Sequence, residues 1–180
     1  MVRRWILTAL GKDRPGIVAR VTKILYELGC NLEDSAMTRL GGEFAIMLVF
    51  SAKGPLSRER LERCCRPLAR SLKLAVHLKP LARAELAARR LGPSYFITVY
   101  GTDKPGIVFR VSNLLAGLGV NITDVSTHRT SRKEAPLYLM LLEVELPRGL
   151  AVKKLERRLQ QLGQRLRVEV SLRSSDADVL

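Results

Sequence analysis

The stretch GKDRPGIVARVTKILYELGCNLED, residues 11–34, returns 90 residues later as GTDKPGIVFRVSNLLAGLGVNITD, residues 101–124. A period of this length is much longer than a solenoid repeat and matches one small domain. The sequence therefore predicts the same domain twice. The positions that recur are, in the first copy, Gly11, Asp13, Pro15, Gly16, Ile17, Val18, Arg20, Val21, Leu25, Leu28, Gly29, Asn31 and Asp34.

The composition is that of an ordinary globular protein, with 47% hydrophobic and 27% charged residues among 180. Two domains of this size would each have a marginal core, so extensive contact between the halves or between two chains is expected, and a homodimer is predicted. No apolar run approaches the roughly 20 residues that span a bilayer. The three cysteines, Cys30, Cys64 and Cys65, are interpreted as packing residues of a protein in the reducing cytoplasm.

The net charge is strongly positive, +14, from 31 Lys and Arg against 17 Asp and Glu. Such a charge raises the affinity for any polyanion, DNA and RNA included, without making that binding the function. Because the basic residues are spread over the predicted helices and the linker, solvated helix faces are favoured over a dedicated nucleic-acid patch. A basic nucleic-acid-binding protein is kept as the alternative function.

Hydrophobic periodicity predicts the same six elements in each copy. In the first copy, Asp13, Pro15 and Gly16 begin a helix that Gly29 ends. The almost continuously apolar run FAIMLVF predicts a central strand, and Pro67 is expected to weaken or end the second helix. The predicted elements of this copy are a strand over residues 5–10, the helix that ends at Gly29, strands over 31–40 and 43–50, a helix over 61–72 and a strand over 72–78.

Strand, helix, strand, strand, helix, strand is the order of a ferredoxin-like fold, an α+β architecture in which two helices cover one face of a four-stranded antiparallel sheet. The second copy has the same order, from a strand that starts at Tyr95 to one over residues 166–172. We predict two such domains, residues 1–79 and 94–173. A short helical linker at residues 80–93 is expected to join them, and residues 174–180 are expected to be a flexible tail.

The turn before the first helix, G-x-D-x-P-G-I-V, carries the most specific functional signal. Gly16 and Gly106 lie at a helix N-terminus, where unpaired N–H groups bind anions, and the missing side chain lets a carboxylate approach the backbone. Asp13 and Asp103 are expected to cap the helix, with contact to a ligand ammonium as the alternative.

Polar residues also recur at both ends of the predicted second strand. Asn31 and Asn121 each offer a donor and an acceptor, which suits a zwitterionic ligand, although each could instead serve only the local turn. Arg39 and Arg129 occupy equivalent points further along the strand. They are expected to be solvated rather than to bind an anion.

This combination resembles the ACT domain, an amino-acid-sensing module attached to metabolic enzymes and regulators. The resemblance rests on the D-x-P-G turn and on the segments GLGCN and GLGVN, and it covers nearly the whole chain apart from the linker and tail. A chain made of two such domains is similar to the glycine cleavage system transcriptional repressor group. The ligand-binding residues that the resemblance implies are Asp13, Pro15, Gly16, Ile17 and Asn31 in the first copy and Asp103, Pro105, Gly106, Ile107 and Asn121 in the second.

The resemblance also implies an assembly and a function. ACT domains commonly pair along their second strands, which would give one eight-stranded sheet in which each turn faces the partner domain's Asn. It further implies a non-catalytic regulator that binds a small amino acid, glycine by the precedent of the group, and that controls a transcription regulator as its protein partner rather than contacting DNA itself.

Motifs of enzymes are missing from the sequence, which has no Walker A loop, no nucleophile elbow and no Cys/His cluster at metal spacing. No catalytic activity, metal or cofactor is therefore predicted. His77 and His128 lie on predicted strands without an evident partner and are expected to be exposed. The adjacent Cys64 and Cys65 are expected to pack in a helix rather than to act as a redox pair. Acylphosphatase-like hydrolysis is disfavoured, because the aspartates of the turn would repel phosphate.

Overall fold

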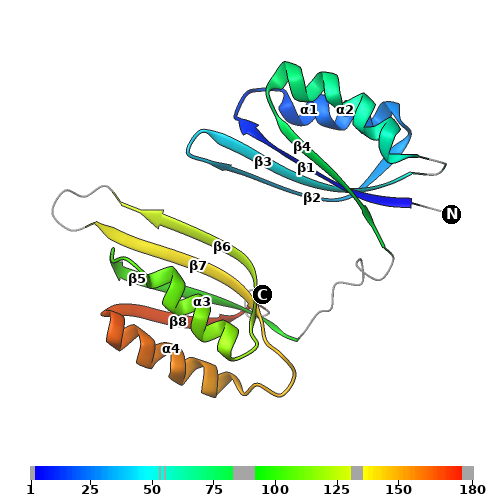
Figure 1. The fold of residues 1–180 in the computed structure, drawn as a ribbon. Helices are drawn as coiled ribbons and strands as arrows, with labels where there is room; N and C mark the ends of the chain where they lie inside the picture. Colours follow the sequence, from blue (N-terminus) through cyan, green and yellow to red (C-terminus); the bar gives the residue numbers. More distant parts are fainter. Residues whose placement is uncertain (1–2, 53, 55, 83–91, 131–135, 176–180) are drawn as a thin grey trace. The chain divides into compact units, whose positions relative to one another are not determined.

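The computed structural model describes all residues except 1–2, 53, 55, 83–91, 131–135 and 176–180 (Figure 1). The chain divides into two compact units, Met1–Ala88 and Arg89–Leu180. Most of the predicted helical linker lies outside the described residues, and so do most of the second hairpin loop and most of the predicted tail.

Unit 1 is a four-stranded antiparallel sheet in the order β2-β3-β1-β4, with both helices on one face (Figure 1). The central position predicted for the FAIMLVF run is confirmed, because β3 lies between β2 and β1. The elements of unit 1 are β1 (Arg3–Lys12), α1 (Ile17–Glu27), β2 (Cys30–Leu40), β3 (Glu43–Ala52), α2 (Arg58–Leu72) and β4 (Ala75–Leu81).

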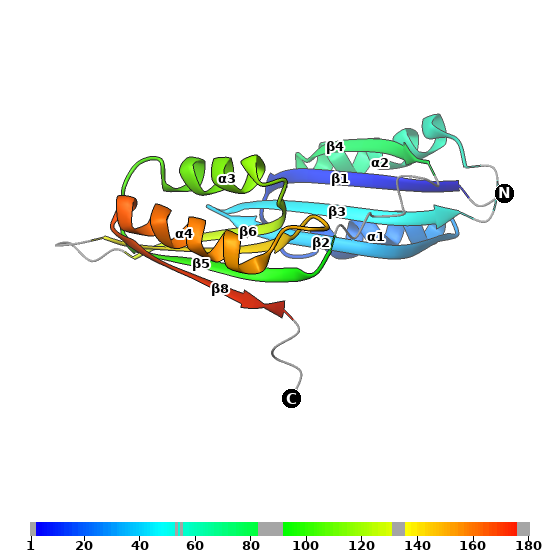
Figure 2. The same cartoon turned by 90° about the horizontal axis from the view of Figure 1, so that it is seen from below.

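Unit 2 repeats this arrangement, with strand order β6-β7-β5-β8, antiparallel pairs, and α3 and α4 on one face of the sheet (Figure 2). The prediction of two ferredoxin-like α+β units is therefore confirmed. The elements of unit 2 are β5 (Ser94–Thr102), α3 (Ile107–Gly117), β6 (Asn121–Arg129), β7 (Leu137–Glu145), α4 (Val152–Leu166) and β8 (Val168–Ser174).

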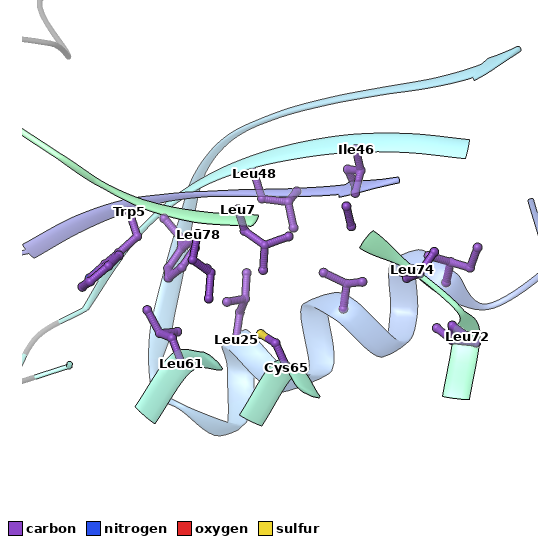
Figure 3. Close-up of a cluster of buried hydrophobic side chains, with 14 of the residues drawn as sticks. Trp5, Leu7, Leu25, Ile46, Leu48, Leu61, Cys65, Leu72, Leu74 and Leu78 are labelled. Atoms are coloured by element: carbon purple, nitrogen blue, oxygen red, sulfur yellow. The ribbon is translucent and has the colours of Figure 1, made fainter. Parts of the chain in front are cut away.

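Each unit has its own core between the sheet and the two helices. In unit 1, Leu25 of α1 and Leu61 and Cys65 of α2 point toward Leu7 and Leu78 on the sheet (Figure 3). Helices of 11 to 15 residues are marginal in water by themselves, so burial of one apolar stripe on the sheet is what stabilises them. The buried core of unit 2 consists of Ile97, Val99, Ile107, Val111, Leu115, Val120, Met140, Leu142, Val144, Leu146, Leu155 and Leu159.

The opposite face of each sheet is open and partly apolar. Strand residues alternate between the two faces, so every second residue of β3 faces the helices and is buried. Between these buried residues, Met47 is about half exposed on the open face. On the open face of unit 2, Phe96 and Tyr100 of β5 and Leu141 of β7 are similarly exposed. These outward apolar residues explain why the central strands lack a polar alternation.

Two predictions about the second helix need correction. Pro67 lies inside α2, which continues to Leu72, because the buried apolar stripe of the helix outweighs the one N–H bond that proline removes. The following strand begins at Ala75 and not at Leu72, since Lys73 turns the chain with φ 54. The predicted role of Gly29 at the end of α1 is confirmed by its φ of 65.

Candidate functional site

The turn between β1 and α1 has a backbone that favours glycine. Gly16 caps α1 with φ 86, and Gly106 caps α3 with φ 89, both in the left-handed region. A Cβ atom on Gly16 would meet no atom within 4 Å, and one on Gly106 would meet only the Arg110 side chain, at 3.9 Å. Space therefore remains beside the helix N-terminus. Pro15 and Pro105 precede these caps and stiffen the turn. They therefore lie before the helix, whereas the sequence had placed them in its first turn.

The first turn of each helix presents N–H groups that have no partner within the helix. The first intrahelical bond of α1 runs from the Arg20 N–H to the Gly16 carbonyl at 3.0 Å, and α3 has the equivalent bond at 3.0 Å. The three N–H groups before it lie at the positive end of the helix dipole, an arrangement that favours an anion. Ile17 and Ile107 present only their backbone at this turn, because their side chains are buried in the two cores.

The aspartates of the turn are not helix caps. Neither α1 nor α3 has a side-chain cap bond, so the predicted capping role is wrong. Instead, the Asp13 carboxylate lies 3.4 Å from Arg39 Nη1, and the Asp103 carboxylate lies 3.0 Å from Arg129 Nε. The two arginine side chains are largely exposed, as expected, but each is ion-paired. These pairs connect the turn to the edge strand in both units.

In unit 1 these residues surround an open groove of about 780 Å³ between the start of α1 and β2. Its polar part holds Asp13 and Arg39, and its apolar lining includes Val18, Met37 and Phe44. The groove thus offers N–H groups for a carboxylate, a carboxylate for an ammonium, and an apolar wall for a small side chain.

Asn31 and Asn121 lie far from the turn of their own unit. Asn31 is at the end of the sheet where β1 begins, whereas the turn follows the other end of β1. Eight residues separate Asn31 from Arg39 and Asn121 from Arg129, which is about 26 Å along a strand. Neither Asn side chain has a hydrogen-bond partner among the described residues, so a purely local turn role finds no support. Within one unit, the turn and the Asn do not form a common site.

Reasoning from the sequence missed the side chains that line the groove. Met37 and Phe44 come from two strands and were assigned only to strand packing, and Arg39 was expected to be free. One signal in the sequence pointed to the ion pair, because Asp13 and Arg39 both recur at the same spacing in the second copy. The sequence carries no such signal for the register of β2 against β3, which brings Arg39 opposite Phe44.

The other candidate residues behave as packing or surface residues. His77 is exposed, and His128 Nε2 lies 3.1 Å from the Ser126 hydroxyl. Burial raises the pKa of Cys65 to about 11, so this thiol stays protonated. Within the described part of the chain, no group of three or more His, Cys, Asp or Glu side chains is placed to hold a metal ion. Among those residues, none of the helices has the length and apolar character needed to cross a membrane.

Known proteins share both the sequence pattern and the fold. A family model described as the ACT domain matches residues 3–79 and 95–173. The glycine cleavage system transcriptional repressor of Escherichia coli is 33% identical over 122 residues, which are 67% of this chain and 62% of the repressor. The match therefore spans less than two thirds of that relative's length. A UPF0237 protein of Methanopyrus kandleri is 37% identical over 81 residues, which are 44% of this chain and 86% of that protein.

Two solved structures have the same fold over nearly the whole chain. An unknown protein from Galdieria sulphuraria has a TM-score of 0.83 at 23% identity, covering 97% of this chain and 99% of that one. A putative glycine cleavage system transcriptional repressor has a TM-score of 0.72 at 23% identity, covering 97% and 98%. Because the family match extends over both units, and each unit has the βαββαβ order with a D-x-P-G turn, the chain belongs to the ACT domain family.

Proposed function

We propose that this protein is a non-catalytic regulator that binds a small amino acid, with glycine as the first candidate, at the turns beside Gly16 and Gly106. One observation carries the proposal: in each unit the helix N-terminus has no side-chain cap, and an aspartate three residues before the glycine leaves it uncapped and pairs with an arginine instead. The N–H groups complement a carboxylate, and Asp13 or Asp103 complements an ammonium. An amino acid presents both charges on one carbon atom.

We further propose that each complete site includes the Asn of a second ACT domain. The support is the distance of about 26 Å along β2 that separates Asn31 from Arg39 in its own unit. β2 and β6 are edge strands of their sheets, so each has backbone groups available for pairing with another strand. Pairing along these strands, in one chain or in a homodimer, is the arrangement that the family suggests.

Ligand binding would act on a protein partner. The repressor from Escherichia coli is named for transcriptional control of the glycine cleavage system. We propose that this chain controls a transcription regulator of amino-acid or one-carbon metabolism in the cytoplasm. A ligand shifts such an interaction only by its different affinities for the free and the partner-bound forms. In the source organism, deletion of the chain should raise a reporter of the glycine cleavage genes, and an unchanged reporter would contradict this part.

The direct test of ligand binding is a thermal-shift and calorimetric titration with glycine, L-alanine and L-serine. A ligand at 100 times its dissociation constant should add about 2.7 kcal/mol of stability. Gly16→Leu and Asn121→Ala should weaken binding, whereas Gly117→Ala, at the end of α3 with open space around it, is the matched control. If no amino acid at millimolar concentration raises the melting temperature, the proposal fails.

Nucleic-acid binding is the second candidate, and one observation favours it. Phe96 and Tyr100 are exposed on the open face of the second sheet, where RNA-binding sheets of this type carry aromatic residues. However, Glu143 pairs in register with Phe96, and Glu169 with Tyr100, so carboxylates share that face. We therefore favour the amino-acid site. Sequence-selective gel shifts that persist above physiological salt would reverse this choice.

A further inference from the structure

The two turn sites differ at two matched strand positions. In unit 1, β2 and β3 place Met37 and Phe44 beside Arg39, and Phe44 pairs with Arg39 in register. In unit 2, Tyr138 pairs in register with Arg129, and Thr127 lies two residues before Arg129, as Met37 lies two before Arg39. Thr127 and Tyr138 therefore occupy the places of Met37 and Phe44.

The unit 1 pair offers a ligand only apolar contact. Met37 is 59% exposed at the groove, whereas Phe44 is only 3% exposed. Neither side chain has a strong hydrogen-bonding group. A ligand hydroxyl held against these two residues would lose its water partners without gaining a new one, which is unfavourable.

The unit 2 pair offers hydroxyl groups instead. Thr127 lies two residues before Arg129, which pairs in register with Tyr138, and both Thr127 and Tyr138 carry a hydroxyl group. A tyrosine hydroxyl is protonated at neutral pH, and burial together with the Asp103 carboxylate raises the pKa of Tyr138 further, so this hydroxyl is available as a donor. Asp103 in turn is bound to Arg129 at 3.0 Å. Hydroxyl donors and acceptors therefore lie next to the charged groups of the turn.

We infer that the two sites select different amino acids, with Thr127 and Tyr138 as the residues that give the unit 2 site a preference for a hydroxyl-bearing side chain. The inference rests on the proposed function, because it assumes that an amino acid binds at the turns. The unit 2 site binds L-serine more tightly than L-alanine, and the unit 1 site binds L-alanine more tightly than L-serine. One matched or unmatched hydroxyl in an open site corresponds to a factor of about three to ten in affinity.

The test uses the full-length chain with one site removed at a time. Gly106→Leu leaves the unit 1 site, and Gly16→Leu leaves the unit 2 site. Calorimetry then measures the dissociation constants of glycine, L-alanine and L-serine for each variant, with circular-dichroism melting as the check on folding. Glycine has no side chain beyond a hydrogen atom, so it reports on the turn alone.

A conversion experiment identifies the residues responsible. In the Gly16→Leu chain, the double substitution Thr127→Met and Tyr138→Phe should change the preference from L-serine to L-alanine while glycine binding stays within about twofold. In the Gly106→Leu chain, Met37→Thr should raise the affinity for L-serine. All three strand substitutions are at incompletely buried positions, so the fold should tolerate them.

The outcomes separate the inference from the proposed function. If glycine binds at both sites but the ratio of serine to alanine affinity is the same at both, the inference is overturned and the proposed function stands. An unchanged ratio after the Thr127→Met and Tyr138→Phe substitution also overturns the inference. If none of the three amino acids binds the unaltered chain, the proposed function itself fails and the inference with it.

Discussion

The turn sites of units 1 and 2 share a backbone but not a lining. Gly16 and Gly106 have φ values of 86 and 89, and each turn carboxylate is paired with an arginine of the edge strand. Beside that arginine, the strands carry the apolar Met37 and Phe44 in unit 1 and the hydroxyl-bearing Thr127 and Tyr138 in unit 2. The comparison teaches that the turn, to which the proposed function assigns the common groups of an amino acid, is set by backbone geometry. The residues proposed to meet the ligand's side chain are set separately, by individual positions of the sheet.

The largest expected effect tests whether the cores of the two units are equivalent. Leu61 and Leu155 are the fourth residues of α2 and α4, and both are completely buried. Leu61→Ala and Leu155→Ala should each lower the free energy of unfolding by about 3 kcal/mol, because each leaves a cavity. Urea denaturation measures both, with Leu40→Ala at an exposed position as the control. A loss below 1 kcal/mol in either unit would show that its core packs differently.

The shared backbone of the turns predicts a smaller, equal effect in the two units. Gly16→Ala and Gly106→Ala should each cost about 1 to 2 kcal/mol, because a side chain disfavours the left-handed conformation. Gly117→Ala should instead be neutral or stabilising by up to about 1 kcal/mol, since Gly117 has a helical backbone with open space around it. Thermal denaturation of the three variants tests this. A destabilising Gly117→Ala would contradict the explanation that the positive φ of Gly16 and Gly106 causes their loss of stability.

The thiol of Cys65 distinguishes the units, because Leu159 takes its place in α4. Its pKa is about 11 in the folded protein, above the value of 9.0 for an ordinary thiol. A raised pKa means that the folded state holds the proton more tightly. The stabilisation that this proton gives is complete below pH 9 and is lost between about pH 9 and 11. At pH 10 the loss amounts to about 1 kcal/mol.

The Cys65→Ala variant should lack this part of the alkaline slope. Urea denaturation at pH 8 and pH 10 measures the difference between the variant and the unaltered chain. An identical decrease in both proteins would mean that Cys65 ionises normally in the folded state.

The smallest expected effect is the difference in coupling energy between the two ion pairs. The Arg129–Asp103 pair is shorter than the Arg39–Asp13 pair, 3.0 Å against 3.4 Å, and all four side chains are partly exposed. Double-mutant cycles with Ala should give coupling energies of about 0.2 to 1 kcal/mol, larger in unit 2 and smaller at high salt. A larger coupling in unit 1 would contradict the geometric difference.

Much of the fold could be predicted from local patterns. The apolar stripe of α1 and the left-handed Gly29 after it follow from spacing and from the conformational freedom of glycine. Pro67 misled because its cost is local, whereas the helix around it is held by contacts with a distant sheet. The aspartates misled for a related reason, since a capping pattern does not reveal an arginine 26 residues away along the chain.

The sequence by itself determined the duplication, the βαββαβ order and the glycine turn. These depend on hydrophobic period and on backbone preferences, which act between neighbours along the chain. Only the tertiary structure decided which residues line each turn, because the register of the edge strand brings Arg39, Met37 and Phe44 together. It also separated Asn31 from the turn, although one helix joins them in sequence. The eight residues of β2 between Asn31 and Arg39 extend farther than the turn can reach, and this separation in space exists only once the sheet is assembled.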